Sequence, residues 1–268
     1  MRAKKRYGQH FLQPPWADKL VAAIDPHPDD RFLEIGPGPG ALTLRLAPRV
    51  SHVTAVELDR EMIDALAPRL PGNVTLVEAD FLEYDLGAFI GDQRIRVAGN
   101  LPYNVSSPIL FRLIDTHRTS GGIVDATVMV QFEVAERIAA TPGSKDYGVL
   151  SLLIQLHADV IPLLTLPPGA FRPAPKVRSS VIRLRFRPPA IDLADEPEFV
   201  AMVRSMFTKR RKTLQNSLRA YAESRAAGSA DALRSAGVDP ARRAETLQLP
   251  ELSRLADFFA SRPRRAVL

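Results

Sequence analysis

Short apolar runs alternate with stretches of helical spacing through the first two-thirds of the chain. Runs rich in apolar and β-branched residues predict strands, and apolar positions three or four residues apart predict helices. The predicted strands cover residues 31–36, 52–59, 73–80, 94–100 and 125–131. The predicted helices cover residues 16–24, 41–49, 60–70 and 108–116. This alternation predicts an α/β fold with a doubly wound, Rossmann-like parallel sheet that binds ligands at the carboxyl ends of its strands.

The pattern changes in the last third of the chain. Residues 160–166 and 180–187 are predicted as strands that close the sheet, as an antiparallel edge. Two prolines, Pro188 and Pro189, end the strand pattern, and only helical spacing follows, at 198–222, 230–236 and 251–260. We therefore predict a first domain over residues 1–188 and a small all-helical domain over residues 189–268.

Composition excludes several classes of site. The 268 residues are 46% hydrophobic and 25% charged, as in ordinary globular proteins, and they include no cysteine, which excludes disulfides, thiolate zinc sites and cysteine nucleophiles. The five histidines form no ligand-spaced pair, so we expect no metal. No apolar run approaches the roughly 18 residues of a membrane span, and the basic N-terminus lacks the apolar segment of a signal peptide. We expect a cytoplasmic protein that acts as a monomer, away from membranes.

The charge distribution points to a polyanionic partner. The formal net charge is +6 and the isoelectric point is about 9.8. One basic cluster comprises Arg2, Lys4, Lys5 and Arg6. A second extends from Arg204 to Arg219 without an acidic residue. A solvated helix face is the alternative explanation of the second cluster.

A glycine-rich segment follows the first predicted strand of the sheet. Gly36, Gly38 and Gly40 have the spacing Gly-x-Gly-x-Gly. Glycine permits positive φ and lets a ligand approach the backbone. The spacing differs from the Gly-x-Gly-x-x-Gly of pyrophosphate binding, which favours a cofactor without a pyrophosphate. Taken alone, the loop is also compatible with a dinucleotide site or a structural turn.

Acidic residues end the next two predicted strands. Glu57 can accept hydrogen bonds from both hydroxyls of a ribose. Asp80 can accept a bond from an adenine amino group, with an apolar neighbour against the ring, and we include Leu58 and Phe81 among the cofactor-binding candidates. Each acid alone could have a structural role. Asp59, for example, is expected to be the N-cap of the next helix. Their succession after the glycine loop predicts a nucleoside site.

The fourth predicted strand runs into Gly99-Asn-Leu-Pro-Tyr103. An exocyclic amino group of adenine is a poor nucleophile because its lone pair is delocalised into the ring. The amide oxygen of Asn100 and a nearby backbone carbonyl can accept both N–H groups and favour a pyramidal nitrogen. Tyr103 can stack on the base. Positioning and electrostatics then supply most of the rate. A structural turn pre-set by Pro102 is the alternative.

These motifs resemble those of the ribosomal RNA adenine dimethyltransferase family, and the bacterial KsgA-type branch most closely. The resemblance extends in order along essentially the whole chain. It is carried by the segments 8–12, 33–40, 56–59, 78–80, 99–108, 131–138, 142–148, 171–177, 210–214 and 237–240.

The resemblance implies a reaction, a cofactor and a partner. The reaction would transfer methyl groups from S-adenosyl-L-methionine to N6 of two adjacent adenosines near the 3′ end of 16S rRNA, within a small ribosomal subunit precursor. The helical domain over 189–268 would dock RNA or the ribosome. The resemblance implies cofactor contacts from His10, Leu12, Gly36, Glu57, Asp80 and Asn100, and Gly38, Leu58 and Phe81 complete the set of cofactor-binding candidates.

The same resemblance implies the catalytic residues Asn100, Leu101, Pro102 and Tyr103, with Phe171 as an aromatic ring opposite the tyrosine. As an isolated residue, Phe171 is equally well explained as core. The chain departs from the family at two positions. Phe132 stands where lysine is common, and Gln215 stands where a basic residue is frequent.

Three other functions share parts of this pattern. A resistance-type methyltransferase of 23S rRNA has the same catalytic motifs, but Pro108 and the segment 142–148 favour the small-subunit branch. A ribosome-assembly factor acting mainly by binding is disfavoured by the intact Asn100, Pro102 and Tyr103. An NAD-dependent oxidoreductase is disfavoured by the glycine spacing.

Overall fold

The structure is a computed structural model that describes residues 9–262. The basic cluster Arg2, Lys4, Lys5 and Arg6 lies outside the described residues. The chain divides into two compact units, of which the first comprises Met1–Glu136 and Ala158–Pro188 and the second comprises Arg137–His157 and Pro189–Leu268. The second unit therefore includes a segment, 137–157, that lies within the first of the two domains we expected. The functional division between residues 1–188 and 189–268 stays a prediction.

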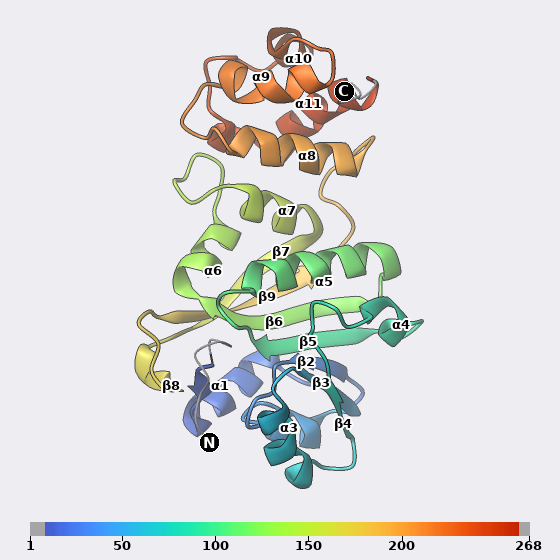
Figure 1. The fold of residues 1–268 in the computed structure, drawn as a ribbon, viewed down its shortest axis with the longest axis vertical. Helices are drawn as coiled ribbons and strands as arrows, with labels where there is room; N and C mark the ends of the chain where they lie inside the picture. Colours follow the sequence, from blue (N-terminus) through green and yellow to red (C-terminus); the bar gives the residue numbers. More distant parts are fainter. Residues whose placement is uncertain (1–8, 263–268) are drawn as a thin grey trace. The chain divides into compact units, whose positions relative to one another are not determined.

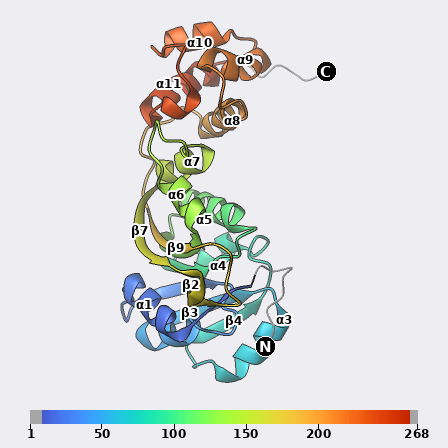
Figure 2. The same cartoon turned by 90° about the vertical axis from the view of Figure 1, so that its left-hand side faces the viewer.

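A seven-stranded sheet forms the centre of the first unit, in the order β4-β3-β2-β5-β6-β9-β7 (Figures 1 and 2). Its strands are β2 (Arg31–Ile35), β3 (His52–Glu57), β4 (Val74–Glu78), β5 (Ile95–Asn100), β6 (Ile123–Gln131), β7 (Ala158–Leu166) and β9 (Ser179–Phe186). The first five strands in this order, β4, β3, β2, β5 and β6, pair in parallel with their neighbours. Strand β9 pairs antiparallel with both β6 and β7. The predicted α/β fold and its antiparallel edge are confirmed.

Helices connect the parallel strands, and α1 and α5 cover opposite faces of the sheet (Figures 1 and 2). The helices are α1 (Pro14–Ile24), α2 (Thr43–Leu46), α3 (Arg60–Leu66), α4 (Leu86–Ile90), α5 (Ser106–Ser120) and α6 (Phe132–Ala139). Three short 3-10 helices accompany them, η2 (Ala47–Arg49), η3 (Ala67–Arg69) and η4 (Pro168–Ala170). The helices α4 and α6 have no counterpart in the predicted elements.

A small second sheet joins distant parts of the sequence. Strand β1 (Phe11–Leu12) pairs antiparallel with β8 (Phe171–Arg172). The amide of Gln13 extends the contact by donating to the carbonyl oxygen of Ala170 at 2.9 Å. The described N-terminal residues are thereby held beside the segment that enters β9. Two-residue strands are too short to show a hydrophobic period, so the sequence pattern did not indicate them.

Arg96 anchors α1 to the sheet. Its guanidinium donates to the carbonyl oxygens of Ile24 and Asp25 at the end of α1, at 2.8 and 3.0 Å. The same group is paired with Asp125 and Asp30 at 3.0 and 2.7 Å. Arg96 is 8% exposed, and a buried charge without partners would be costly. Two carboxylates and two carbonyl oxygens satisfy the N–H groups of its guanidinium.

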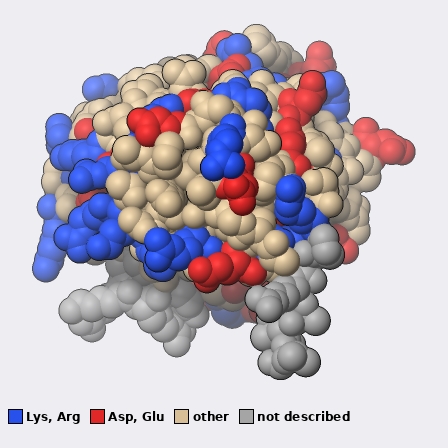
Figure 3. Space-filling view, turned by 90° about the horizontal axis from the view of Figure 1, so that it is seen from above, with Lys and Arg blue, Asp and Glu red and all other residues tan. Residues whose placement is uncertain are grey.

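The second unit is helical. It contains α7 (Val149–His157), α8 (Glu196–Phe207), α9 (Leu214–Ser224), α10 (Ser229–Ser235), η5 (Ala244–Thr246) and α11 (Leu249–Ala260). The prediction of one helix over 198–222 is wrong, because α8 and α9 are separated by a turn that contains the residues 208–212. On the face drawn in Figure 3, Lys and Arg side chains gather along one side.

Glu198 organises the interior of this unit. It is 1% exposed, accepts a hydrogen bond from the Tyr221 hydroxyl at 2.5 Å and forms an ion pair with Arg225. Apolar side chains from α8, α9 and α11 surround these groups, among them Phe199, Leu218 and Phe259, each 0% exposed. No helix within residues 9–262 is both long and apolar enough to cross a membrane.

Candidate active site

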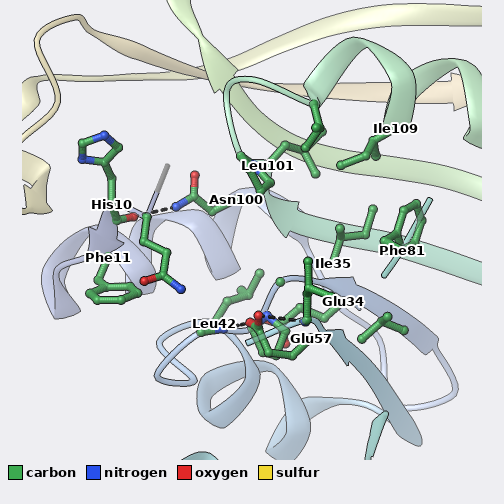
Figure 4. Close-up of a pocket in the computed structure, with 18 of the residues that line it drawn as sticks. His10, Phe11, Glu34, Ile35, Leu42, Glu57, Phe81, Asn100, Leu101 and Ile109 are labelled. Atoms are coloured by element: carbon green, nitrogen blue, oxygen red, sulfur yellow. Dashed lines mark hydrogen bonds between the residues drawn. The ribbon is translucent and has the colours of Figure 1, made fainter. Parts of the chain in front are cut away.

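A pocket lies at the carboxyl ends of β2, β3, β4 and β5, and Figure 4 shows the side chains around it. Every residue that we predicted for the site lines this pocket, with the exception of Phe171. The predicted residues in its wall are His10, Leu12, Gly36, Gly38, Glu57, Leu58, Asp80, Phe81, Asn100, Leu101, Pro102 and Tyr103. The topology explains this gathering, because parallel strands bring their carboxyl ends to one edge of the sheet.

The glycine loop after β2 forms one wall. Gly36, Gly38 and Gly40 have φ values of 65°, 53° and 84°, which residues with a Cβ rarely adopt. A Cβ on Gly40 would lie 2.4 Å from Cδ1 of Leu66, so a larger residue here would require the Leu66 side chain of α3 to move. A Cβ on Gly38 would lie 3.4 Å from the ring of Phe11, on the pocket side of the loop.

Glu57 ends β3 and holds the glycine loop. Its Oε2 accepts from the amide of Gly38 at 3.0 Å, and its Oε1 accepts from the amides of Leu58 and Asp59, each at 2.9 Å (Figure 4). Glu57 is 8% exposed. Each carboxylate oxygen has two lone pairs, so these bonds saturate Oε1 and leave one acceptor position on Oε2.

Asp80 follows β4 and faces the same pocket. Its Oδ1 accepts from the amide of Leu82 at 2.8 Å, which fixes the carboxylate in the turn after the strand. Phe81 is 6% exposed, whereas Leu58 is 48% exposed although it is a large apolar side chain. Two carboxylates and two apolar side chains thus border the part of the pocket next to the glycine loop.

Asn100 ends β5, and its amide orientation is set by a neighbour from the N-terminal segment. Nδ2 donates to the carbonyl oxygen of His10 at 2.8 Å. A carbonyl can only accept, so the donor end of the amide faces His10 and Oδ1 remains an acceptor. The amide of the next residue, Leu101, donates to the carbonyl oxygen of Met129 at 3.1 Å, which ties the turn to β6.

Neighbouring side chains hold both the hydroxyl and one ring face of Tyr103. Its hydroxyl and the Ser179 hydroxyl are 2.8 Å apart, and its ring stacks with that of His10 at a centroid distance of 5.5 Å and an interplanar angle of 26°. Nδ1 of His10 is 2.8 Å from the carbonyl oxygen of Pro173. Burial raises the pKa of Tyr103 above its ordinary value, so the phenol stays neutral near pH 7.

Phe171 does not line the pocket and is buried in the core of the first unit, where it is the register partner of Leu12. It is 1% exposed and belongs to the apolar cluster that includes Leu12, Leu166 and Val181. The structure therefore does not bring its ring to the pocket beside Tyr103. The stacking role implied by the resemblance stays a prediction, with core packing as the alternative that fits this burial.

Glu34 lines the pocket, and our sequence reasoning did not single it out. It is 2% exposed in β2, and its Oε2 has no hydrogen-bond partner within residues 9–262. Burial raises the pKa of Glu34 to about 7, Thr43 opposes this shift and the carboxylate of Glu57 adds to it. The available signal was a single acid inside the apolar run of Phe32-Leu-Glu-Ile35.

Residues 9–262 contain no group of three or more His, Asp or Glu side chains that could hold a metal ion. The pocket instead combines amide donors of a glycine loop, carboxylate acceptors and apolar side chains. These groups suit an uncharged or cationic organic molecule with hydroxyl and amino groups.

Comparisons with known proteins agree with this geometry. The family model described as ribosomal RNA adenine dimethylase matches residues 1–261. The chain is 43% identical, over 95% of each chain, to a ribosomal RNA small subunit methyltransferase A of Xanthomonas campestris. It also resembles the crystal structure of a dimethyladenosine transferase from Plasmodium falciparum, with a TM-score of 0.77, 25% identity and coverage of 92% of this chain and 96% of that one.

A second solved structure is that of the 23S rRNA methyltransferase ErmE, with a TM-score of 0.66, 27% identity and coverage of 92% and 98% of the two chains. The family model spans both structural units. The match also includes the strand-end motifs that form the pocket. The chain therefore belongs to the ribosomal RNA adenine dimethylase family.

Proposed function

We propose that this enzyme transfers methyl groups from S-adenosyl-L-methionine to N6 of two adjacent adenosines near the 3′ end of 16S rRNA, in a small-subunit precursor. One observation carries the proposal. A single pocket brings the glycine loop, Glu57 and Asp80 together with Asn100 and Tyr103. Groups suited to a nucleoside cofactor thus adjoin groups suited to an adenine amino group.

The residues of the pocket fit the proposed cofactor. The remaining acceptor position on Oε2 of Glu57 would receive a ribose hydroxyl, and Asp80 would receive the amino group of the cofactor's adenine. Leu58 and Phe81 would contact the ring, since both are apolar and line the pocket. The methionine end would then lie along the glycine loop, where a side chain on Gly38 would fill space.

The residues after β5 would activate the target base. When bound, the cofactor supplies a sulfonium methyl group that is open to in-line attack. Oδ1 of Asn100 would accept one N–H of the target amino group, and a backbone carbonyl of the same turn would accept the other. These bonds favour a pyramidal nitrogen with an available lone pair. The methylated ammonium is acidic enough to lose its proton to water, so no strong general base is needed.

Tyr103 would orient the base. His10 stacks against one face of the tyrosine ring, and Ser179 holds its hydroxyl. The opposite face is then left for the adenine. A ring held at both its face and its hydroxyl loses little further freedom when the base binds, and such pre-organisation lowers the entropic part of the barrier.

Two of the three alternative functions named from the sequence also involve rRNA or the ribosome. The similarity favours the small-subunit reading, because the relative named for the small subunit is 43% identical and the 23S rRNA methyltransferase is 27% identical. A factor that acts mainly by binding would have no need for the fixed amide of Asn100. Its contact with the His10 carbonyl favours a catalytic role.

Primer extension on rRNA from cells with and without the protein tests the proposal. Dimethylated adenine blocks reverse transcriptase, so we expect a stop near the 3′ end of 16S rRNA that disappears when the protein is absent. The stop should return with the wild-type protein but not with an Asn100→Ala variant. An unchanged stop on 16S rRNA, with a changed stop on 23S rRNA, would contradict the proposed target.

A further inference from the structure

An aromatic ring and a guanidinium are stacked next to the pocket, on residues that the proposed reaction does not use. Phe132 begins α6 directly after β6, and Cζ of Arg178 lies 4.1 Å from the centroid of its ring. The amide of Phe132 donates to the carbonyl oxygen of Arg178 at 3.0 Å. Phe132 is half-buried and Arg178 is exposed, so the stacked pair is accessible to solvent.

The backbone connects this pair to the site. Gln131 and Ser179 are register partners in the β6–β9 ladder, and each immediately adjoins one member of the pair. The hydroxyl of the same Ser179 is 2.8 Å from the hydroxyl of Tyr103. Arg178 directly precedes Ser179, so its Cα lies about 3.8 Å from the Cα of the residue whose hydroxyl is beside that of Tyr103. Figure 1 shows the start of α6 and the segment between β8 and β9 at the same edge of the sheet.

One side of the pair, the segment that leads from β8 to β9, is basic and partly apolar, whereas Glu133 and Glu136 are exposed on the α6 side. Arg172 is exposed at the end of β8, Lys176 and Arg178 are exposed between β8 and β9, and Val177 beside them is 44% exposed. The sequence contains no acidic residue from Phe171 to Arg187. Cationic side chains suit phosphodiester groups, and a flat ring covered by a guanidinium suits a nucleobase.

We propose that Phe132 and Arg178 form a stacking platform for a nucleotide that flanks the target adenosine. The inference rests on the proposed function, because it requires an RNA substrate in the pocket. A cationic side chain alone acts on the phosphate chain as a charge, whereas the ring of Phe132 offers a flat apolar face to a base. The platform therefore gives this chain a contact that depends on the presence of a base beside the target, and not only on the phosphate chain.

Coupling between the protein residue and the RNA position provides the test. Small-subunit particles are reconstituted from 16S rRNA with a synthetic 3′ segment, in which single flanking nucleotides are replaced by abasic sites. Particle affinity and methylation are measured for the wild type, Phe132→Leu and Phe132→Tyr. Base–aromatic stacking is worth roughly 5- to 150-fold in affinity, so we expect a loss in this range for the wild type at one flanking position.

The expected signature is that Phe132→Leu shows this loss on intact particles and no further loss on particles abasic at that position. Phe132→Tyr should restore binding. Phe89, a half-buried ring on α4 at the amino ends of the strands, provides the matched control, and Phe89→Leu should change neither quantity. Urea unfolding checks that each variant is folded, and Phe132→Met replaces the leucine variant if that variant does not fold.

The inference would be overturned if Phe132→Leu and the abasic replacement lowered affinity independently at every flanking position. It would also be overturned if the wild type were insensitive to all abasic sites. These outcomes leave the proposed function intact as long as the wild type methylates intact particles. Absence of methylation by the wild type contradicts the proposed function itself. The affinities of the wild type and the Phe132 variants for intact and abasic particles would then still show whether the platform contacts a base.

Discussion

The side chain of Asn100 donates from Nδ2 to the carbonyl oxygen of His10 at 2.8 Å. This bond joins the end of β5 to a residue 90 positions earlier, and it determines which end of the amide faces the pocket. His10 is itself held by its contact with Pro173 and by stacking on Tyr103. The acceptor oxygen proposed for the target amino group is therefore pre-oriented before RNA binds, which is the condition for strong electrostatic stabilisation.

Replacement of Asn100 by alanine should lower turnover by at least roughly 100-fold, the scale for removal of a pre-organised transition-state contact. Asn100→Asp should also be impaired, because it keeps an acceptor but turns a carboxylate oxygen toward the His10 carbonyl. Single-turnover methylation at saturating cofactor and RNA measures the effect. Turnover near that of the wild type would remove Asn100 from the proposed chemistry.

Replacement of Glu57 by alanine should weaken S-adenosyl-L-methionine binding by about 1.5–3 kcal/mol, the range for a hydrogen bond to a charged group. Two causes act together, since the ribose acceptor is lost and the amide of Gly38 loses its partner. Calorimetric titration measures cofactor affinity. Glu83 is exposed and lies outside the pocket, so Glu83→Ala serves as the control. Unchanged cofactor affinity in the Glu57 variant would exclude it from the site.

The positions of the site residues were predictable because they follow strands whose hydrophobic pattern is clear. Glu57, Asp80 and Asn100 each come at or just after a strand end, and parallel pairing brings them together. Glu34 was missed because a buried acid within a strand has the same spacing as a solvent-facing residue. The sequence alone does not distinguish the two cases, since the burial depends on the packing of other elements on the central strand β2, among them α2 with Thr43.

The break between α8 and α9 illustrates a different limit. Residues 198–222 contain neither glycine nor proline, and Lys and Arg are good helix formers, so local propensity predicts a continuous helix. In the structure, the amide of Leu214 donates to the carbonyl oxygen of Arg242 at 2.7 Å, and that of Gln215 donates to Pro240 at 3.3 Å. These long-range bonds replace helical bonds, and no short window of sequence contains them.

Glu34 should make stability depend on pH. Its pKa is raised from 4.5 to about 7, mainly by burial. Between these values the folded protein holds a proton that the unfolded chain releases, so stability falls as pH rises from about 4.5 to 7 and is constant above. The shift corresponds to a loss of roughly 3 kcal/mol. Glu34→Gln should therefore match the wild type near pH 4.5 and exceed its stability at pH 8.

Urea unfolding of the wild type and Glu34→Gln at several pH values measures this difference. The charged groups that influence Glu34 include Glu57, whose ionisation adds to the penalty. A stability difference that is independent of pH would show that Glu34 does not titrate in this window. The conclusion would then be that its carboxylate is stabilised by a group other than Thr43.

Variants of Phe171 distinguish between core packing and base stacking as the role of this side chain. Because the side chain is 1% exposed, Phe171→Ala should lower the free energy of unfolding by about 3–5 kcal/mol. Phe171→Leu fills much of the same space and should keep both stability and turnover. Urea unfolding and single-turnover methylation of the two variants measure these effects. A stable leucine variant with a loss of turnover of about 5-fold or more, in the range expected for a lost stacking contact, would instead support the stacking role.

The basic run Lys209-Arg-Arg-Lys212 lies in the turn between α8 and α9, and its members differ in their contacts. Arg210 forms an ion pair with Glu245 at 3.2 Å and donates to the carbonyl oxygen of Ser144 at 3.2 Å. It is therefore part of the packing of the helical unit, and its reversal would place two carboxylates together. Lys209, Arg211 and Lys212 are exposed and remain candidates for phosphate contacts.

Reversal of Arg211 and Lys212 to glutamate should weaken binding to the ribosomal substrate and leave cofactor affinity unchanged. The slope of log affinity against log salt should become shallower by about one unit for each lost phosphate contact, because fewer counterions are released, and by somewhat less on single strands. Arg234→Glu is the matched control, since Arg234 is exposed in the same unit and pairs only locally with Asp231 at 3.1 Å. A folded double variant with an unaltered slope would show that the turn is a solvated face. RNA docking would then be assigned to the basic cluster of Arg2, Lys4, Lys5 and Arg6, where the same reversal and the same slope measurement apply.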